Sequence, residues 1–251
     1  MHHSVGLVPR AWTRRHRPNY MTDHRLTSAH SHAAQGALTR TDGASDYLRS
    51  HTAQAHGHLE RSATARRLMA PSISPAEYTQ VLLAWLACWE PMEAVLESMR
   101  PPGIDPARAP AARAARLYHD LELAGMGADS IRRSACDLQD AGWQERLRTL
   151  AARSDGWLGI AYVAQGALLG GALISSRLRT SLPPYLATAT TFFAGAPHPP
   201  QHLAIQWRHW RGWLDLQLVA PEQQHRAAEA ALATFQGMAR TFDLPAHGRV
   251  H

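Results

Sequence analysis

The chain contains no lysine and only two cysteines among its 251 residues. Cys88 and Cys136 stand far apart with no CxxC pair, which excludes a disulfide framework and argues against a zinc site. The region before residue 45 has no apolar run long enough for a secretory signal. Together these absences predict a reduced, cytoplasmic setting.

Two further absences narrow the fold and the partners. No segment alternates apolar and polar residues over a useful length, so we expect no β-sheet. The 26 basic residues are all arginines, and they give a formal net charge of +6. They are scattered rather than gathered in runs with interleaved aromatics, so we expect no nucleic-acid partner in spite of the positive charge.

The chain divides by composition into three parts. Residues 1–44 are rich in His, Arg, Thr, Ser and Gly without an apolar period, which predicts a disordered N-terminal extension. The histidines of this extension are irregularly spaced, so metal binding there is only weakly indicated. We expect one helical domain over residues 45–243, which is long enough for a sizeable core, and a flexible tail over 244–251.

Helical signals follow one another through this domain, and the sequence predicts an all-α fold. Ser45 and Asp46 are expected to cap the first helix, and Ser74, Pro75 and Glu77 form a capping-box pattern at the second. The expected helices cover about 45–69, 75–100, 110–124, 128–140, 144–152, 155–179, 185–194, 200–218 and 221–241.

The first candidate site is the segment Thr52-x-x-x-His56-x-x-Leu59-Glu60. Leu59 shares the helical side of His56, so the imidazole is expected to face a mostly apolar space. Glu60, one turn later, can accept a proton from one ring nitrogen and leave the other free to bind a metal. By spacing alone, however, the pair is more typical of a core histidine satisfied by a carboxylate. His51 and His58 are expected to be solvated on other faces.

The second candidate site is a run of 21 uncharged residues from Gly156 to Ser176. Gly166 and Gly170 share one helical face, where each costs about 1 kcal/mol relative to alanine. Such a face lets another helix or a planar ligand approach the backbone, and spacing does not decide between them. Arg177 lies on the same face, seven residues after Gly170, and can pair with an anionic group.

The same run is long enough to cross a membrane, which is an alternative that must be weighed. It contains Gln165, several glycines and two serines, and it is the only such segment in the chain. The mean hydropathy of the chain is -0.31. We therefore expect a buried helix and no membrane span.

Together, these segments resemble the bacterial heme oxygenases, including those paired with bacteriophytochromes. The first segment matches the family pattern T-x-x-x-H-x-x-L-E, and the run from Tyr162 to Gly171 is similar to the pattern Y-V-x-E-G-S-x-L-G-G. Further similarity lies at Tyr78, Leu82, Trp89–Glu93, Phe192, Phe193 and Trp207. The resemblance covers residues 45–240 and implies a single helical bundle that holds heme between a proximal and a distal helix.

The resemblance assigns roles to individual residues. It implies that His56 is the proximal iron ligand, supported by Glu60, and that Gly166 and Gly170 let the distal helix lie over the heme. Arg177 corresponds to a basic position that pairs with a heme propionate, with Arg66 and Arg179 as further candidates. Arg113 corresponds to an arginine of the distal water network. Tyr162 and Gly171 complete the expected heme-binding set.

The implied reaction is oxidative cleavage of heme to biliverdin, carbon monoxide and ferrous iron. It uses O2 and an external electron donor, a ferredoxin or reductase, because the chain has no flavin or nicotinamide motif. A bacteriophytochrome is a candidate acceptor of the biliverdin. Two departures from the family pattern, Gln165 for glutamate and Ala167 for serine, leave open a heme-binding or heme-sensing protein without turnover. A helical interaction module is the other alternative.

Overall fold

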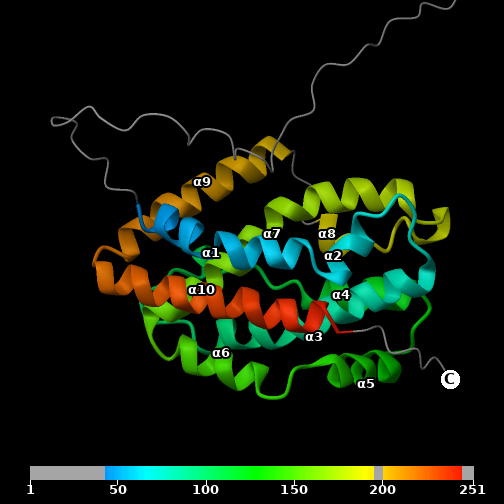
Figure 1. The fold of residues 1–251 in the computed structure, drawn as a ribbon, viewed down its shortest axis with the longest axis horizontal. Coiled ribbons are helices and arrows are strands. Elements are labelled where there is room, and N and C mark those ends of the chain that lie inside the picture. Colours follow the sequence, from blue (N-terminus) through cyan, green and yellow to red (C-terminus); the bar gives the residue numbers. More distant parts are fainter. Residues whose placement is uncertain (1–42, 195–199, 245–251) are drawn as a thin grey trace, which may run out of the picture. The chain divides into compact units, whose positions relative to one another are not determined.

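The computed structural model describes residues 43–194 and 200–244, and the side chains of residues 200 and 201 are excluded. The expected disordered extension and most of the expected tail lie outside these residues. Within them every regular element is helical, which confirms the all-α prediction (Figure 1). The helices are α1 (Ala44–Glu60), α2 (Ala63–Leu68), α3 (Pro75–Ser98), α4 (Ala114–Leu123), α5 (Ala128–Leu138), α6 (Trp143–Ala151), α7 (Ser154–Ser181), α8 (Thr191–Ala194), α9 (Pro200–Gln217) and α10 (Pro221–Phe242), with 3-10 turns at Pro106–Arg108 and Pro184–Leu186.

The first predicted helix is wrong in two respects. It is two helices, because Ser62 interrupts it and accepts a hydrogen bond from the Ala65 N–H at 3.2 Å as the cap of α2. Its own N-cap is Gly43 rather than Ser45 or Asp46. The Ser45 N–H instead donates to the Asp215 carboxylate at 2.7 Å, so a side chain of α9 supplies the cap.

Helix α3 begins as predicted and passes through the centre of the domain. Its capping box is present, with the Ser74 N–H donating to Glu77 at 2.9 Å. Pro91 lies inside this helix and has no N–H to donate to the Ala87 carbonyl four residues earlier. That carbonyl accepts a hydrogen bond from the Gln139 amide at 3.4 Å, so the gap in the helix contributes to the docking of the segment after α5.

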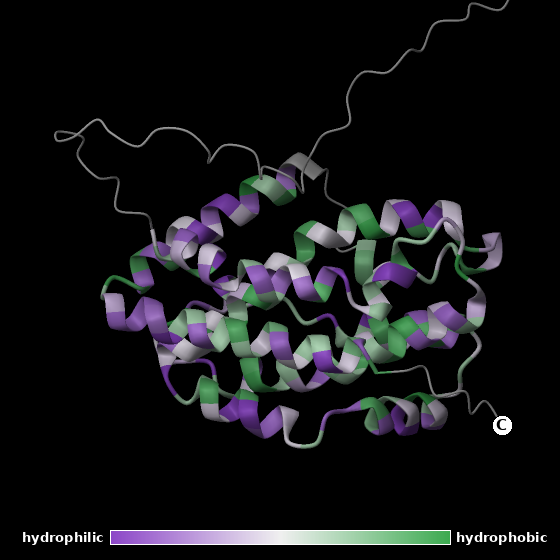
Figure 2. Cartoon of the chain, in the orientation of Figure 1, coloured by the Kyte–Doolittle hydropathy of each residue, from purple (hydrophilic) through white to green (hydrophobic). Residues whose placement is uncertain are grey.

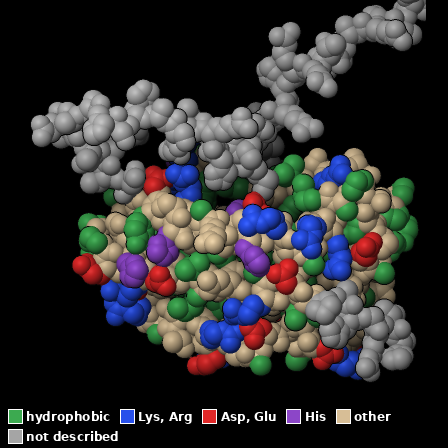
Figure 3. All heavy atoms as spheres, in the orientation of Figure 1, with side chains coloured by type: hydrophobic (Ala, Val, Ile, Leu, Met, Phe, Trp, Pro, Cys, Tyr) green, Lys and Arg blue, Asp and Glu red, His purple; other side chains and the backbone are tan. Residues whose placement is uncertain are grey.

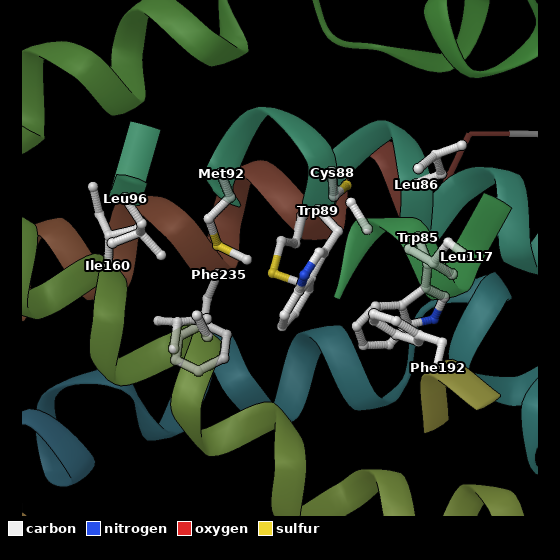
Figure 4. Close-up of a cluster of buried hydrophobic side chains, with 14 of the residues drawn as sticks. Trp85, Leu86, Cys88, Trp89, Met92, Leu96, Leu117, Ile160, Phe192 and Phe235 are labelled. Atoms are coloured by element: carbon white, nitrogen blue, oxygen red, sulfur yellow. The ribbon is translucent and has the colours of Figure 1, made fainter. Parts of the chain in front are cut away.

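Helix α10 is the shared packing partner of α1, which carries His56, and of α7, which carries the glycine run. A methyl group at Gly159 of α7 would overlap the Ala227 carbonyl of α10, so these two backbones touch. The aromatic and aliphatic side chains of α3 fill the hydrophobic core, and Trp89 and Met92 lie near the centre of the cluster in Figure 4. The glycine therefore sets how closely α7 and α10 approach.

The predicted helix over 185–194 is wrong: a 3-10 turn is followed by the four-residue helix α8. The buried carboxylate of Asp120 on α4 fixes where α8 starts. It accepts hydrogen bonds from the Thr191 N–H at 3.0 Å, the Thr191 hydroxyl at 2.8 Å and the Phe192 N–H at 2.9 Å. A long-range contact of this kind leaves no local sequence signal.

Helix α7 is long and apolar enough to cross a membrane by length and composition alone. Half of its most apolar window is buried in the domain, and it packs on α10, α9, α8 and α6. In Figure 2 it lies among helices that carry hydrophilic and hydrophobic residues on different sides. Burial among these helices accounts for its first half, and the exposed second half is described below.

We predict that Asp120→Asn lowers the free energy of unfolding by about 2 kcal/mol, because an amide oxygen cannot replace both carboxylate oxygens and the amide N–H₂ would face the Phe192 N–H. Burial raises the pKa of Asp120, so part of the cost of the buried charge is relieved in the variant. Denaturant unfolding measures the change. The matched control is Asp129→Asn at the exposed end of α5, which should change stability little, and equal effects would contradict the capping role.

Candidate functional site

Helix α1 presents His56 at the surface rather than in the apolar enclosure that was expected. The His56 side chain is 53% exposed, and its Nδ1 lies 3.5 Å from Oε1 of Glu60, as the spacing predicted. Apolar contact comes from one side, where the Phe235 ring of α10 meets the imidazole edge-on at 5.2 Å between centroids. With Nδ1 directed at a carboxylate, Nε2 is left as the nitrogen that can coordinate a metal.

Two neighbouring histidines hold α1 against α10. His51 Nε2 lies 3.0 Å from Glu229, and His58 Nε2 lies 3.2 Å from Asp243. His58 is 62% exposed, as expected, and His51 is 30% exposed, but each also pairs with a carboxylate of the C-terminal region. Figure 3 shows histidine side chains among arginines on the face where α1 and α10 meet. These contacts fix both ends of the turn that carries His56.

The glycines of α7 have different surroundings. A methyl group at Gly171 would lie 2.6 Å from the Phe193 carbonyl of α8, so this glycine is packed. Among the described residues, a methyl group at Gly170 would meet nothing within 4 Å, and one at Gly166 would meet only Trp207, at 3.7 Å. Close packing on another helix therefore does not explain Gly166 and Gly170, although it does explain Gly159 and Gly171.

Gly166 and Gly170 belong to an exposed apolar stripe, which we call the open face of α7: Gly166, Leu169, Gly170 and Leu173. Its members recur at helical spacing, and the two leucines are 38% and 49% exposed. Beside it, Trp207 of α9 and Gln165 line a small hollow with Leu168, Leu169, Leu203 and Gln206. An apolar stripe left open in this way is typical of a ligand-binding surface.

The end of α7 lies beside the segment that follows α2. The Ile73 N–H approaches the Ser181 carbonyl at 3.5 Å, and α2 packs on α7. Helices α1 and α7 both pack on α10, so His56 and the open face are carried by two helices that share one support.

Arg177 continues the open face by one turn, and its side chain is half-buried. Its Nε is buried without a hydrogen-bond partner among the described residues. The other two predicted arginines are engaged with the protein: Arg179 donates to the Ser175 hydroxyl at 3.0 Å and Arg66 to the Arg61 carbonyl at 2.6 Å. Of these three, Arg177 is the one with a buried N–H that an anionic group can satisfy.

Arg113 is buried beneath α8. Its guanidinium lies over the rings of Trp89 and Phe192, at 5.2 Å and 4.5 Å from their centroids, and it donates to the Phe192 carbonyl. Burial lowers its pKa to about 10. Its Nε and Nη1 have no partner within the described part of the chain. Helix α8 contacts both Arg113 and Gly171, so it links this arginine to α7.

A larger cavity, of about 630 Å³, lies at the other end of α7. It is lined by Pro101, Pro102, Gly103, Ile104, Ala152, Arg153, Ser154, Asp155, Leu158, Gln217, Leu218 and Gln223. This lining holds no histidine or cysteine, and the Asp155 carboxylate is already paired with Arg226 at 2.8 Å. We therefore take His56 and the open face of α7, rather than this cavity, as the candidate site.

Comparison with known proteins identifies the family and the fold of the chain. The profile of the family described as heme oxygenase matches residues 42–243. No curated protein shows significant similarity to the chain. Among solved structures, heme oxygenase from Leptospira interrogans is similar with a TM-score of 0.65 and 20% identity, over 80% of this chain and 99% of that one.

Two cyanobacterial structures, both from Synechocystis sp. PCC 6803, are also similar over 80% of this chain. Heme oxygenase-2, in complex with heme and NO, has a TM-score of 0.64, 20% identity and 84% of its own length covered. Heme oxygenase-1, in complex with heme, has a TM-score of 0.61, 16% identity and 91% of its length covered. At these identities the similarity shows that the fold is shared.

We predict that alanine has opposite effects at two glycines of α7. Gly159→Ala should lower the free energy of unfolding by ~3 kcal/mol, because the new methyl group overlaps the Ala227 carbonyl. Gly170→Ala has open space and should instead raise it by up to about 1 kcal/mol through helix propensity. Chemical denaturation of both variants measures the two changes in the free energy of unfolding. A comparable loss at Gly170 would mean that the open face is packed in solution.

Proposed function

Because the chain belongs to the heme oxygenase family, we propose that it cleaves heme oxidatively to biliverdin, carbon monoxide and ferrous iron. One observation carries the proposal: α1, which presents a histidine beside a carboxylate, and α7, whose Gly166 and Gly170 are not packed on another helix among the described residues, pack on the same helix α10. Heme is the substrate, and its iron supplies the oxygen chemistry when bound. The protein supplies ligation, orientation and control of access.

His56 is the proposed axial ligand. The Glu60 carboxylate, 3.5 Å from Nδ1, favours the tautomer that has its proton on Nδ1 and a free Nε2, and it increases the basicity of the ring. The exposure of His56 leaves that nitrogen accessible without movement of α1. Phe235 limits rotation of the ring from the α10 side. No pattern around His56 points to Phe235, because it lies 179 residues further along the chain.

The open face of α7 is the proposed distal surface. With no side chain at Gly166 or Gly170, a planar tetrapyrrole can lie against the helix backbone, and Leu169 and Leu173 offer apolar contact. The buried, unpaired Nε of Arg177 fits a propionate carboxylate, which would set the rotation of the ring. Gly171 supports this surface from behind through α8, and Tyr162 supports it through its contact with Trp207.

Arg113 is proposed to act at a distance from the substrate. Its two unpartnered N–H groups can hold ordered water beneath α8, and its bond to the Phe192 carbonyl fixes that helix. Because α8 packs on Gly171, a change at Arg113 would alter the position of α7. This makes Arg113 a positioning residue with a place in a water network, which refines the catalytic role first expected of it.

Electrons are proposed to come from a separate ferredoxin or reductase, and a bacteriophytochrome remains a proposed acceptor of the biliverdin. The Gln165 side chain faces the small hollow beside Trp207 rather than a charged partner, and Ala167 is half-buried on α7. Neither residue occupies the open face, so the two departures from the family pattern leave the proposed heme surface intact.

The test is hemin titration followed by aerobic reduction. Purified protein should give a shifted Soret band that disappears with ascorbate in air while a broad red biliverdin absorbance rises. His56→Ala should lose the axial histidine spectrum and turnover, and His56→Gly should regain the spectrum when imidazole is added. His119→Ala, an exposed histidine on α4, is the matched control and should behave like the wild type.

Each other result has a distinct meaning. A Soret band that persists under reductant and oxygen would make the protein a heme binder without oxygenase activity. Absence of any Soret shift would reject heme as the ligand of this surface. Full activity in His56→Ala would reject His56 as the iron ligand while leaving the family assignment in place.

A further inference from the structure

Four aromatic rings form a continuous series that passes beside the open face of α7. Tyr162 lies 5.6 Å from Trp207, Trp207 stacks on Trp210 at 5.6 Å with 7° between the planes, and Trp210 lies 5.7 Å from Trp213 (ring centroids). The Trp207 ring is also the nearest side chain to Gly166. The series therefore joins the proposed substrate surface to the middle of α9.

The rings differ in exposure. Tyr162 and Trp210 are buried, and Trp210 is held by a hydrogen bond from its Nε1 to the Arg108 carbonyl at 2.9 Å, whereas Trp207 and Trp213 are half-buried. All four rings pack on the hydrophobic core. Core packing does not require that the rings also contact one another in series, with one half-buried ring beside Gly166 and another further along α9.

We propose that Tyr162, Trp207, Trp210 and Trp213 form a relay that carries oxidising equivalents away from bound heme to the surface. This inference rests on the proposed function. Indole and phenol are the aromatic side chains most easily oxidised by one electron, and rings in van der Waals contact exchange electrons readily. An enzyme that activates oxygen beside its own side chains is protected if an oxidant that fails to attack the substrate is reduced by electrons from this series, because the oxidation then moves away from the substrate surface.

Hydrogen peroxide is the oxidant that makes the step testable. Each peroxide takes up two electrons and two protons and becomes two waters. The electrons come from two aromatic side chains, each of which loses one electron and its N–H or O–H proton to give a neutral radical. Electrons then pass from ring to ring toward the oxidant, so the stable damage collects at Trp213, the end of the series away from the open face.

The experiment adds peroxide to the heme complex and maps oxidised tryptophan by mass spectrometry, with electron paramagnetic resonance to detect the radicals. Protein without heme gives the background. Trp143 and Trp157, buried on other contacts, serve as internal references. The variant Trp210→Phe keeps an aromatic ring that resists oxidation, and Trp210→Tyr has nearly the same shape but can be oxidised. A normal Soret band shows that each variant binds heme.

The relay predicts heme-dependent oxidation of Trp213 above that of Trp143 and Trp157. This excess should fall to the reference level in Trp210→Phe and persist in Trp210→Tyr. Equal oxidation of Trp213 in both variants would overturn the relay, as would oxidation of Trp213 no greater than the references in the wild type. Loss of heme binding in the wild type would instead overturn the proposed function, and the Soret band separates that result from failure of the relay.

Discussion

The contact between Gly159 of α7 and the Ala227 carbonyl of α10 is the constraint on which the rest of the site depends. It brings α7 onto α10 as closely as two helix backbones can pack, and α10 in turn holds α1 through His51 and His58. Helix α10 therefore determines the positions of both His56 and the open face. The two surfaces need no direct contact with each other.

Much of the helical pattern could be predicted from the sequence, because many helix ends are determined by nearby capping residues and prolines. Ser74, Pro75 and Glu77 determine the start of α3 by contacts within four residues, and prolines delimit α9 and α10. The errors fall where a distant side chain replaces a local cap. Asp215 caps α1 and Asp120 caps α8, and no sequence pattern near residues 45 or 191 predicts either contact.

Part of the candidate site could also be predicted from local spacing. The spacing of His56 and Glu60 predicts their pairing, and the spacing of Gly166 and Gly170 predicts that they share one helical face. Spacing could not separate packed glycines from open ones, because that depends on what lies opposite: the Phe193 carbonyl at Gly171, and open space at Gly170. The depth of Arg113 and the aromatic neighbours from α9 and α10 are likewise properties of the assembled helices.

The uneven burial of α7 has a mechanical and an evolutionary consequence. Residues 156–164 are enclosed and Gly171, Ser175 and Leu178 are buried again, whereas residues 165–170 are only partly buried, so the helix is held on both sides of a partly open middle. Glycines in this middle segment lower its stiffness. Bending is then concentrated in the part proposed to meet the ligand, and substitutions there can change ligand fit while the two packed parts preserve the fold.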